Sequence, residues 1–278
     1  MVKQRDWDFY EKNAQQRISE LNSKHRYFEY RTNLYKVLNL CAIMEGLKPK
    51  SVLDFGCGLG GALNILASKF QIRDAIGIDI SSTIIAYAKK EYPEYTFIQG
   101  NREKLRNIHV DLVTFFDVLE HLEDIPGILR LARSSANYIG IKIPLEKTWL
   151  ISLLNNLHLK EKKSRFYSAG HLYEFNQIEV ERILRQAGLK ILNKKSNFQP
   201  KEIQFSDITK NRMKAKSGYL AKLKYCAYTA LTKFPYRVTC PLFQLINSRD
   251  FFVLCQAGKK KDAHTGSYRH FDRVRQPI

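Results

Sequence analysis

An acidic residue and a cluster of glycines directly follow a short apolar run near residue 50. The stretch VLDFGCGLGG covers residues 52–61 and places four glycines within six positions after Asp54. Bare glycines let a ligand lie against the backbone at the point where a strand feeds the N-terminus of a helix. The stretch therefore predicts a bound nucleotide-like ligand, and the carboxylate of Asp54 has to suit that ligand.

Two binding motifs fit the same glycines. Gly56, Gly58 and Gly61 match the dinucleotide fingerprint G-x-G-x-x-G, with Asp79 at the distance expected of a ribose contact. The pattern D-x-G-x-G-x-G, which begins at Asp54, also matches a turn that binds S-adenosylmethionine (SAM). A tight turn without any ligand is the third alternative.

Three further features favour SAM over a dinucleotide. The carboxylate of Asp54 would repel a pyrophosphate but attract an ammonium and a sulfonium. Asn101 ends the third expected strand, where its amide could hydrogen-bond an adenine edge. The run FFDVLEHLED after the fourth strand is rich in ionisable groups, whereas a nicotinamide site would favour small residues.

The ionisable groups of that run could carry chemistry. Asp117, Glu120 and His121 fall at positions i, i+3 and i+4, which share one face if a helix begins there. His171, in GHLYEF, follows the fifth expected strand. His121 or His171 could act as a general base for a hydroxyl acceptor, and the two carboxylates with His121 could hold a Mg²⁺-like ion. A structural or substrate-contact role is the third interpretation.

Strand-like and helix-like stretches alternate over most of the chain, which predicts an α/β fold with a mostly parallel sheet covered by helices on both faces. Two helices are expected within residues 8–46, with an apolar stripe made of Tyr27, Tyr30, Leu34, Val37, Leu38 and Cys41. The expected strands cover residues 51–56, 74–80, 95–100, 110–117, 138–144, 189–195 and 250–257. The expected helices between them cover residues 60–70, 82–91, 124–136 and 175–187.

Composition limits the classes of protein to which this chain could belong. No apolar run reaches the ~18 residues of a transmembrane helix, and the N-terminal residues lack the pattern of a signal peptide. The five cysteines are scattered, which fits a reducing cytoplasm. The net charge is +19, which favours acidic partners such as RNA or anionic lipid headgroups, although a solvated basic surface is the alternative.

The order of these motifs resembles class I SAM-dependent methyltransferases, and most of all the branch with the ubiquinone-biosynthesis O-methyltransferases. The resemblance rests on VLDFGCGLGG, IGIDIS, FIQGN, DLVTFFDVLEHL and GHLYEFNQIEVERILRQAGLKIL, in that order. It covers about residues 50–198 and the strand at 250–257. It implies a Rossmann-like sheet of seven strands whose last strand is antiparallel.

The resemblance also implies roles for individual residues. Asp54 and the backbone of the turn would hold the methionine moiety of SAM, Asp79 would bind the ribose hydroxyls, and Ile80 would pack on the adenine. Phe116 would line the cofactor beside the transferred methyl group. The residues expected to bind the cofactor are Asp54, Gly56, Gly58, Gly60, Asp79, Ile80, Asn101 and Phe116. Asn101 stands where the family usually has Asp. A D/E-x-x-E-H arrangement binds a divalent ion in the ubiquinone O-methyltransferases and in enzymes that 2′-O-methylate small-RNA ends.

We expect five segments along the chain. They are an N-terminal helical cap (1–48), a SAM-binding core (49–200), a basic helical insertion or lid (201–249), a last core strand (250–258) and a mobile basic tail (259–278). The insertion could close over a hydrophobic acceptor, lie on an anionic membrane surface, contact RNA or simply pack on the core.

The expected function is SAM-dependent methylation of a small-molecule, saccharide or lipid-linked acceptor, with S-adenosylhomocysteine as the product. The expected location is the cytoplasm, with the inner face of the membrane as one alternative. An RNA 2′-O-methyltransferase and a SAM-binding partner without catalysis are the two competing functions, and an NAD-dependent oxidoreductase is a more distant one.

Overall fold

The computed structural model of the chain describes residues 4–147, 170–200, 203 and 249–258. Its strands are β1 (Ser51–Phe55), β2 (Asp74–Asp79), β3 (Thr96–Gln99), β4 (Val110–Phe116), β5 (Ala136–Leu145), β6 (Lys190–Asn197) and β7 (Arg249–Gln256). Its α-helices are α1 (Gln4–Ser19), α2 (Ser23–Cys41), α3 (Gly61–Phe70), α4 (Ser82–Glu91), α5 (Ile125–Ser135) and α8 (Gln177–Gln186). Two 3-10 helices, η1 (Arg102–Asn107) and η2 (Leu119–His121), complete the described elements.

The seven strands form one sheet in the order β3-β2-β1-β4-β5-β7-β6. The pairs from β3 to β5 are parallel, whereas β7 runs antiparallel to both β5 and β6. This confirms the Rossmann-like, seven-stranded methyltransferase sheet that the sequence predicts. The last strand of the chain is inserted between two earlier ones, so the sheet is completed from a distant part of the sequence.

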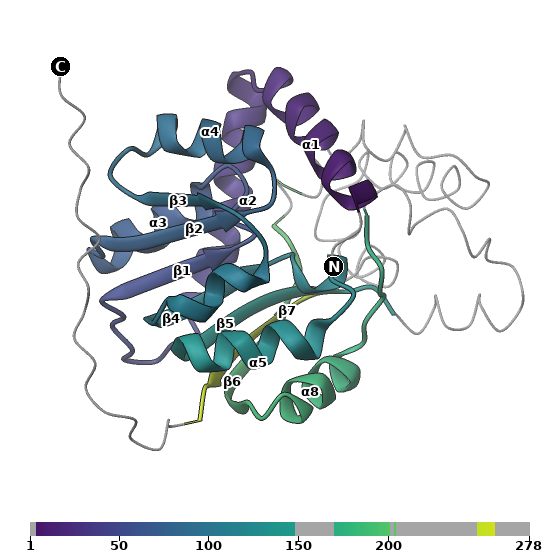
Figure 1. Cartoon of the computed structure of the whole chain (residues 1–278). Coiled ribbons are helices and arrows are strands. Elements are labelled where there is room, and N and C mark those ends of the chain that lie inside the picture. The colour runs from purple at the N-terminus through teal and green to yellow at the C-terminus, as the bar shows by residue number, and fades with distance from the viewer. Residues whose placement is uncertain (1–3, 148–169, 201–202, 204–248, 259–278) are drawn as a thin grey trace, which may run out of the picture.

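Helices cover both faces of this sheet (Figure 1). On one face α2, α3 and α4 bury a core that includes Leu40, Leu63 and Phe252. On the other face η1, α5 and α8 bury a second core that includes Leu129, Leu184 and Phe251. The neighbours Phe251 and Phe252 thus point to opposite cores, as alternate residues of a strand must.

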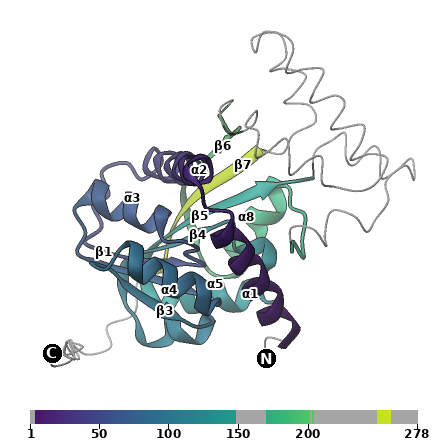
Figure 2. The same cartoon turned by 90° about the horizontal axis from the view of Figure 1, so that it is seen from above.

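The N-terminal helix α1 lies beside α4, as both views show (Figures 1 and 2). Ala14 of α1 packs with Leu59 of the glycine turn and Ile84 of α4 in a small separate cluster. The carboxylate of Glu11 accepts hydrogen bonds from the backbone N–H groups of Ser82 and Thr83, each 3.1 Å long. An anion at this helix N-terminus is favourable because the N–H groups there have no partner within the helix. Helix α1 is thereby fastened next to the glycine turn.

The buried face of α2 differs from the expected one. Tyr35, Val37 and Leu40 are buried, and of these only Val37 belongs to the expected stripe, whose Tyr27, Tyr30 and Leu38 are exposed. Leu40 packs over Gly140 of β5, where a Cβ would meet its side chain at 2.8 Å. The position of the sheet therefore determines which face of α2 is buried. The helical spacing alone does not reveal that position.

Two sequence expectations fall mainly on residues outside those described. These are the basic insertion at 201–249, of which only 203 and 249 are described, and the tail at 259–278. Within the described part of the chain, no helix combines the length and the apolar character needed to cross a membrane.

Candidate functional site

The candidate site lies at the carboxyl ends of β1 and β4, where the strand order reverses direction. Chain connections from β1 lead toward β2 and β3 on one side, while β4 continues toward β5 on the other. In open α/β sheets this switch point is the usual place for a ligand. The glycine turn follows β1, and the FFDVLEHLED run follows β4, so both candidate motifs meet there.

The glycine turn after β1 has a backbone that only glycine adopts with ease. Gly56, Gly58 and Gly60 have φ of 72°, 53° and 85°. A Cβ on Gly56 would meet Val118 Cγ2 at 2.5 Å, and one on Gly60 would meet Tyr92 at 2.9 Å. The backbone N–H of Gly56 is also bonded to Ile78 O at 2.7 Å. The turn is thus a glycine-rich cradle held in place by these bonds and contacts, which fits the close approach of a nucleotide.

Gly56→Ala is expected to weaken SAM binding at least tenfold and to lower the free energy of unfolding by roughly 1–3 kcal/mol, because it combines a positive φ with a clash. Isothermal titration with SAM and thermal melting would measure the two effects. Gly46→Ala is the matched control, because Gly46 has a φ of 75° but its Cβ would meet nothing within 4 Å. It should cost stability without changing SAM affinity. Equal loss of SAM affinity in both variants would contradict the assignment of the cradle.

Asp79, at the end of β2, connects the cradle to the next strand. Its Oδ2 accepts a hydrogen bond from Gly58 N and its Oδ1 accepts one from Ser81 N, each 3.0 Å long. Burial raises the pKa of Asp79, against the lowering effect of these backbone bonds. The carboxylate is therefore oriented beside the glycine turn, as a ribose contact requires.

Asp54 is buried at the end of β1 and has few partners. Only 1% of it is exposed, and its Oδ1 accepts a hydrogen bond from Thr114 Oγ1 at 2.7 Å. Burial raises its pKa to about 7, although the Thr114 hydroxyl and the charge of Lys36 act in the opposite direction. A carboxylate of this kind gains from a cation brought next to it, which fits the ammonium or sulfonium expected there.

The other residues expected to bind the cofactor lie at the same edge of the sheet. Ile80 directly follows β2, and its carbonyl accepts a bond from Gln99 Nε2 at 3.3 Å. Asn101 caps η1, with its Oδ1 accepting from Glu103 N at 3.0 Å, which leaves its NH₂ group for a ligand. Phe116 is buried at the end of β4. Their contacts with a cofactor stay predictions.

The residues after β4 do not form the single helical face that their spacing predicts. Asp117 adopts a φ of 60°, and only the 3-10 helix η2 follows. Lys142 Nζ contacts the Asp117 carboxylate on one side, and Lys36 Nζ contacts it at 2.9 Å on the other. Burial alone would raise the pKa of Asp117, but Lys142 and Lys36 outweigh it and hold this pKa well below its usual range. Both carboxylate oxygens of Asp117 are therefore engaged by lysines, and Asp117 is not part of the cluster of ligand atoms that contains Glu120 and His121.

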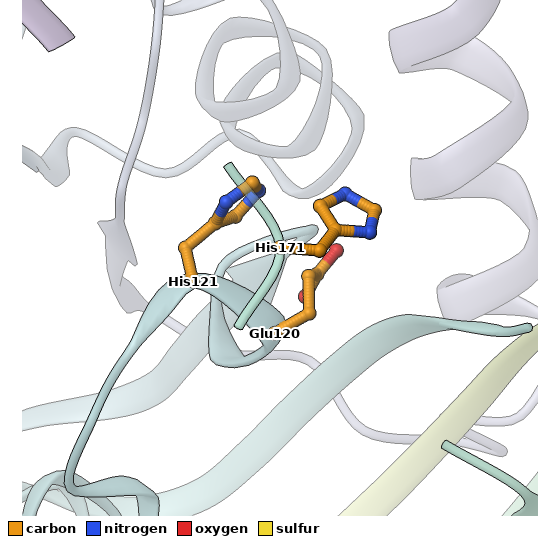
Figure 3. Close-up of side chains that lie close together, drawn as sticks. All are labelled: Glu120, His121 and His171. Carbon is orange, nitrogen blue, oxygen red and sulfur yellow. The ribbon is translucent and has the colours of Figure 1, made fainter. Parts of the chain in front are cut away.

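Glu120 and His121 instead gather with His171, which comes from a loop 50 residues further on (Figure 3). One oxygen or nitrogen atom from each of the three side chains lies within 4.8 Å of the others. Glu120 is 1% exposed, and neither of its carboxylate oxygens has a hydrogen-bond partner in the described structure. An unpartnered buried carboxylate beside two imidazoles is a donor set that fits a divalent cation.

The two imidazoles have different partners. His121 Nδ1 lies 3.0 Å from Gly170 O, so it donates its proton there and leaves Nε2 with a lone pair. Burial lowers the pKa of His121. His171 Nδ1 lies 3.1 Å from Glu146 Oε2, and although burial opposes it, this carboxylate raises the pKa of His171. The neutral form, which can accept a proton, is therefore favoured more at His121, and the protonated form more at His171.

Four charged residues of the site were missed at the sequence level. Glu146 orients His171. Lys36 and Lys142 contact Asp117, and Asp250 contacts Lys142. Lys142 could have been noticed, because it lies within the apolar run YIGIKIP, and a lysine in a buried strand is rare unless it is paired. The other three carry no comparable signal.

Comparison with known proteins identifies the class. The model of a family described as methyltransferase domain matches residues 25–194, which is more than half of the chain. The fold around the switch point is the Rossmann-like fold of class I methyltransferases. The chain belongs to this methyltransferase domain family.

Curated relatives share about half of the chain. A putative methyltransferase 235L of Invertebrate iridescent virus 6 is 30% identical over 149 residues, which cover 51% of this chain and 56% of that one. A demethylmenaquinone methyltransferase of Chlorobaculum tepidum is 28% identical over 169 residues, covering 53% and 68% of the two chains. The match thus spans little more than half the length of the viral relative.

Solved structures share the fold over a longer range. Magnesium protoporphyrin IX methyltransferase (ChlM) from Synechocystis PCC 6803, with bound SAH, has a TM-score of 0.54 and 17% identity, covering 90% of this chain and 97% of that one. A complex of the Haloferax volcanii Trm112 activator with a putative methyltransferase gives a TM-score of 0.55 and 15% identity, covering 83% and 90%. At these identities the likeness supports the fold alone.

Proposed function

We propose that this chain is a SAM-dependent methyltransferase that transfers the methyl group to a hydroxyl oxygen of a small-molecule, saccharide or lipid-linked acceptor. Family membership and the glycine cradle support SAM as the donor and S-adenosylhomocysteine as the product. The observation that carries the choice of a hydroxyl is His121, an imidazole whose Nδ1 is held by Gly170 O and whose pKa is lowered by burial, which favours its neutral form. Its free Nε2 can take the proton that a hydroxyl must lose.

SAM, when bound, supplies a methyl group made reactive by its sulfonium. Asp54 would face the cationic end of the cofactor, Asp79 the ribose, and the N–H groups of the cradle the remaining polar atoms. These residues do no covalent chemistry, because an in-line displacement needs mainly two correctly placed reactants. His121 would accept the hydroxyl proton at Nε2, and His171, held by Glu146, would orient the acceptor.

His121→Asn is expected to lower kcat by about 10²- to 10⁴-fold, because it removes the base. The amide of Asn can still donate to Gly170 O, so SAM should raise the melting temperature as much as in the wild type. The test measures transfer of a tritiated methyl group to 3,4-dihydroxybenzoate, glucose 1-phosphate and farnesyl phosphate, which represent the three acceptor classes. His109→Asn is the control, since His109 is exposed. Transfer to nitrogen or carbon only, or unchanged kcat in His121→Asn, would contradict the proposal.

Glu120 supports a cation-assisted version of the same reaction. Neither of its carboxylate oxygens has a hydrogen-bond partner among the described residues, and one of them lies within 4.8 Å of a nitrogen of each imidazole, so Glu120, His121 and His171 would hold a divalent ion. Such an ion, when bound, supplies positive charge that lowers the pKa of a nearby hydroxyl. In that version the imidazoles serve as ligands, and the acceptor proton leaves to water or to a more distant base.

The finer predictions about substrate and location depend on residues outside those described. Contact with an anionic membrane surface, a lid over a hydrophobic acceptor and RNA binding all rest on the basic segment at 201–249. The resemblance to ubiquinone-biosynthesis O-methyltransferases and a cytoplasmic location are likewise part of this proposal. RNA 2′-O-methylation and a partner without catalysis remain the competing functions, and the acceptor panel separates both from the leading one.

A further inference from the structure

Two lysines contact the carboxylate of Asp117, which the sequence pattern assigns to a cation site. Asp117 lies in contact with Lys142 Nζ on β5 and at 2.9 Å from Lys36 Nζ on α2. Its backbone N–H is also bonded to Lys142 O at 3.0 Å, so Lys142 holds both the main chain and the side chain. Both oxygens of the Asp117 carboxylate are thus engaged by lysines, and its backbone adopts a φ of 60°.

The charges of Asp117 and Asp250 are balanced by two lysines without any further cation. Lys142 is 3% exposed and contacts a second carboxylate, Asp250 Oδ1, at 2.9 Å. Two ammonium groups therefore face two carboxylates in this group. A dication placed against Asp117 would have to displace Lys36 or Lys142, which would leave that lysine near uncompensated positive charge.

Glu120, unlike Asp117, has no hydrogen-bond partner for its carboxylate in the described structure. It is buried, carries two oxygens without a partner in the described structure and lies beside His121 and His171. Figure 3 shows the Glu120 carboxylate directed toward the His171 ring, with His121 on the adjacent side. Both imidazoles keep one ring nitrogen that no described residue occupies, because Gly170 O and Glu146 engage the Nδ1 atoms.

We propose that Lys142 and Lys36 withhold Asp117 from the cation site, which leaves Glu120, His121 and His171 as the three protein ligands and selects a transition-metal ion over Mg²⁺. Imidazole suits Zn²⁺, Co²⁺ and related ions, whereas Mg²⁺ requires an octahedral set of oxygens. With Asp117 added, the set would contain two carboxylates and would suit Mg²⁺ better. The inference rests on the cation-assisted version of the proposed function.

The test uses the full chain without SAM and without an acceptor, and titrates Co²⁺ or Mg²⁺ by calorimetry and by the visible absorption of Co²⁺. We expect Co²⁺ to bind at least 100-fold more tightly than Mg²⁺. Glu120→Gln should weaken Co²⁺ binding by at least about 100-fold, beyond what loss of an outer-shell partner costs. Asp117→Asn should change it less than threefold, and Glu123→Gln, at an exposed neighbour, should not change it.

Four results would overturn the inference: no Co²⁺ binding by the wild type, Mg²⁺ binding as tight as Co²⁺ binding, equal losses in Asp117→Asn and Glu120→Gln, or fewer than two imidazoles around the ion. X-ray absorption at the cobalt edge counts the imidazoles on the unmodified protein, so the test stands even where a variant does not fold. Methyl transfer enters none of these measurements. Failure of the proposed activity and failure of this ligand set are therefore distinguishable.

Discussion

Raising the pH from 5.5 to 7 is expected to tighten SAM binding by about fifteenfold, and Asp54→Asn is expected to abolish this change. Burial raises the pKa of Asp54 to about 7, with Thr114 and Lys36 lowering it and Asp79 raising it. Only the ionised carboxylate attracts the ammonium of the cofactor. Its ionised fraction rises from about 3% to one half over this range, and apparent affinity follows the competent fraction.

The measurement is a set of calorimetric titrations with SAM at several pH values, kept below the α-amino pKa of roughly 7.7–8.0. Asp54→Asn keeps the size of the side chain and an acceptor for Thr114 but removes the charge, so its SAM affinity should be low and flat with pH. A wild-type affinity that stays constant or falls as the pH rises would contradict the assigned role of Asp54.

The stability of the ligand-free protein should change with pH in the opposite direction to SAM affinity, and it serves as a control. The pKa of Asp54 is higher in the folded chain than its ordinary value of 3.8, so the folded state holds this proton more tightly than the unfolded state. The stabilising effect is complete below 3.8 and is lost as the pH rises through about 7. Ligand-free protein should therefore melt at a lower temperature at pH 7 than at pH 5.5, and less so in Asp54→Asn. A steeper fall in the variant would contradict this.

Lys142→Met is expected to lower the free energy of unfolding by about 3–5 kcal/mol, the usual cost of breaking a buried ion pair from one side. The side chain of Lys142 is 4% exposed, and its loss would leave the buried Asp250 and the partly buried Asp117 without their shared cation. The melting temperature should fall by roughly 10 °C for a chain of this size. Lys195→Met, at an exposed lysine of β6, should stay within about 0.5 kcal/mol of the wild type.

Adding Asp250→Asn should return more than half of the stability lost in Lys142→Met, because it removes the buried charge of Asp250, whereas Asp117 still contacts Lys36. Chemical denaturation of the wild type, both single variants and the double variant closes a double-mutant cycle. The coupling free energy should be well above the 0.3–0.5 kcal/mol that independent sites show. Additive effects would mean that Lys142 and Asp250 do not stabilise each other.

Most of the sheet could be predicted because its signals are local. The run at 110–117 and the glycines after Asp54 mark strand, turn and helix within a few residues, and β4 and β1 lie where they indicate. Helix α2 shows the limit of such signals. Tyr27 and Tyr30 have helical spacing with Leu34, yet they are exposed, because which side of α2 is buried depends on how it lies on β5 and β7.

Only two parts of the candidate site could be predicted from the sequence: the main-chain cradle after β1 and the individual acids Asp54 and Asp79. Asp54 and Asp79 lie near the carboxyl ends of β1 and β2, two strands that the pattern locates. The contacts of Asp117 could not be predicted in this way, because they depend on lysines 36 and 142, which are distant in sequence and come from a helix and another strand. The contact between His121 and His171 also could not be predicted from local spacing, because His171 comes from a loop much further along the chain.

The insertion of β7 between β5 and β6 has a consequence for how the chain reaches its native state. Leu145 of β5 pairs with Arg249 of β7, about a hundred positions later, and such distant pairings slow folding. A growing chain that has not yet produced β7 would present β5 as a free edge, open to pairing with other chains. It would also lack Asp250, one of the two anions that Lys142 contacts. Completion of the sheet and neutralisation of its buried lysine are thus the same late event, which makes this half of the domain the part most exposed to misassembly during synthesis.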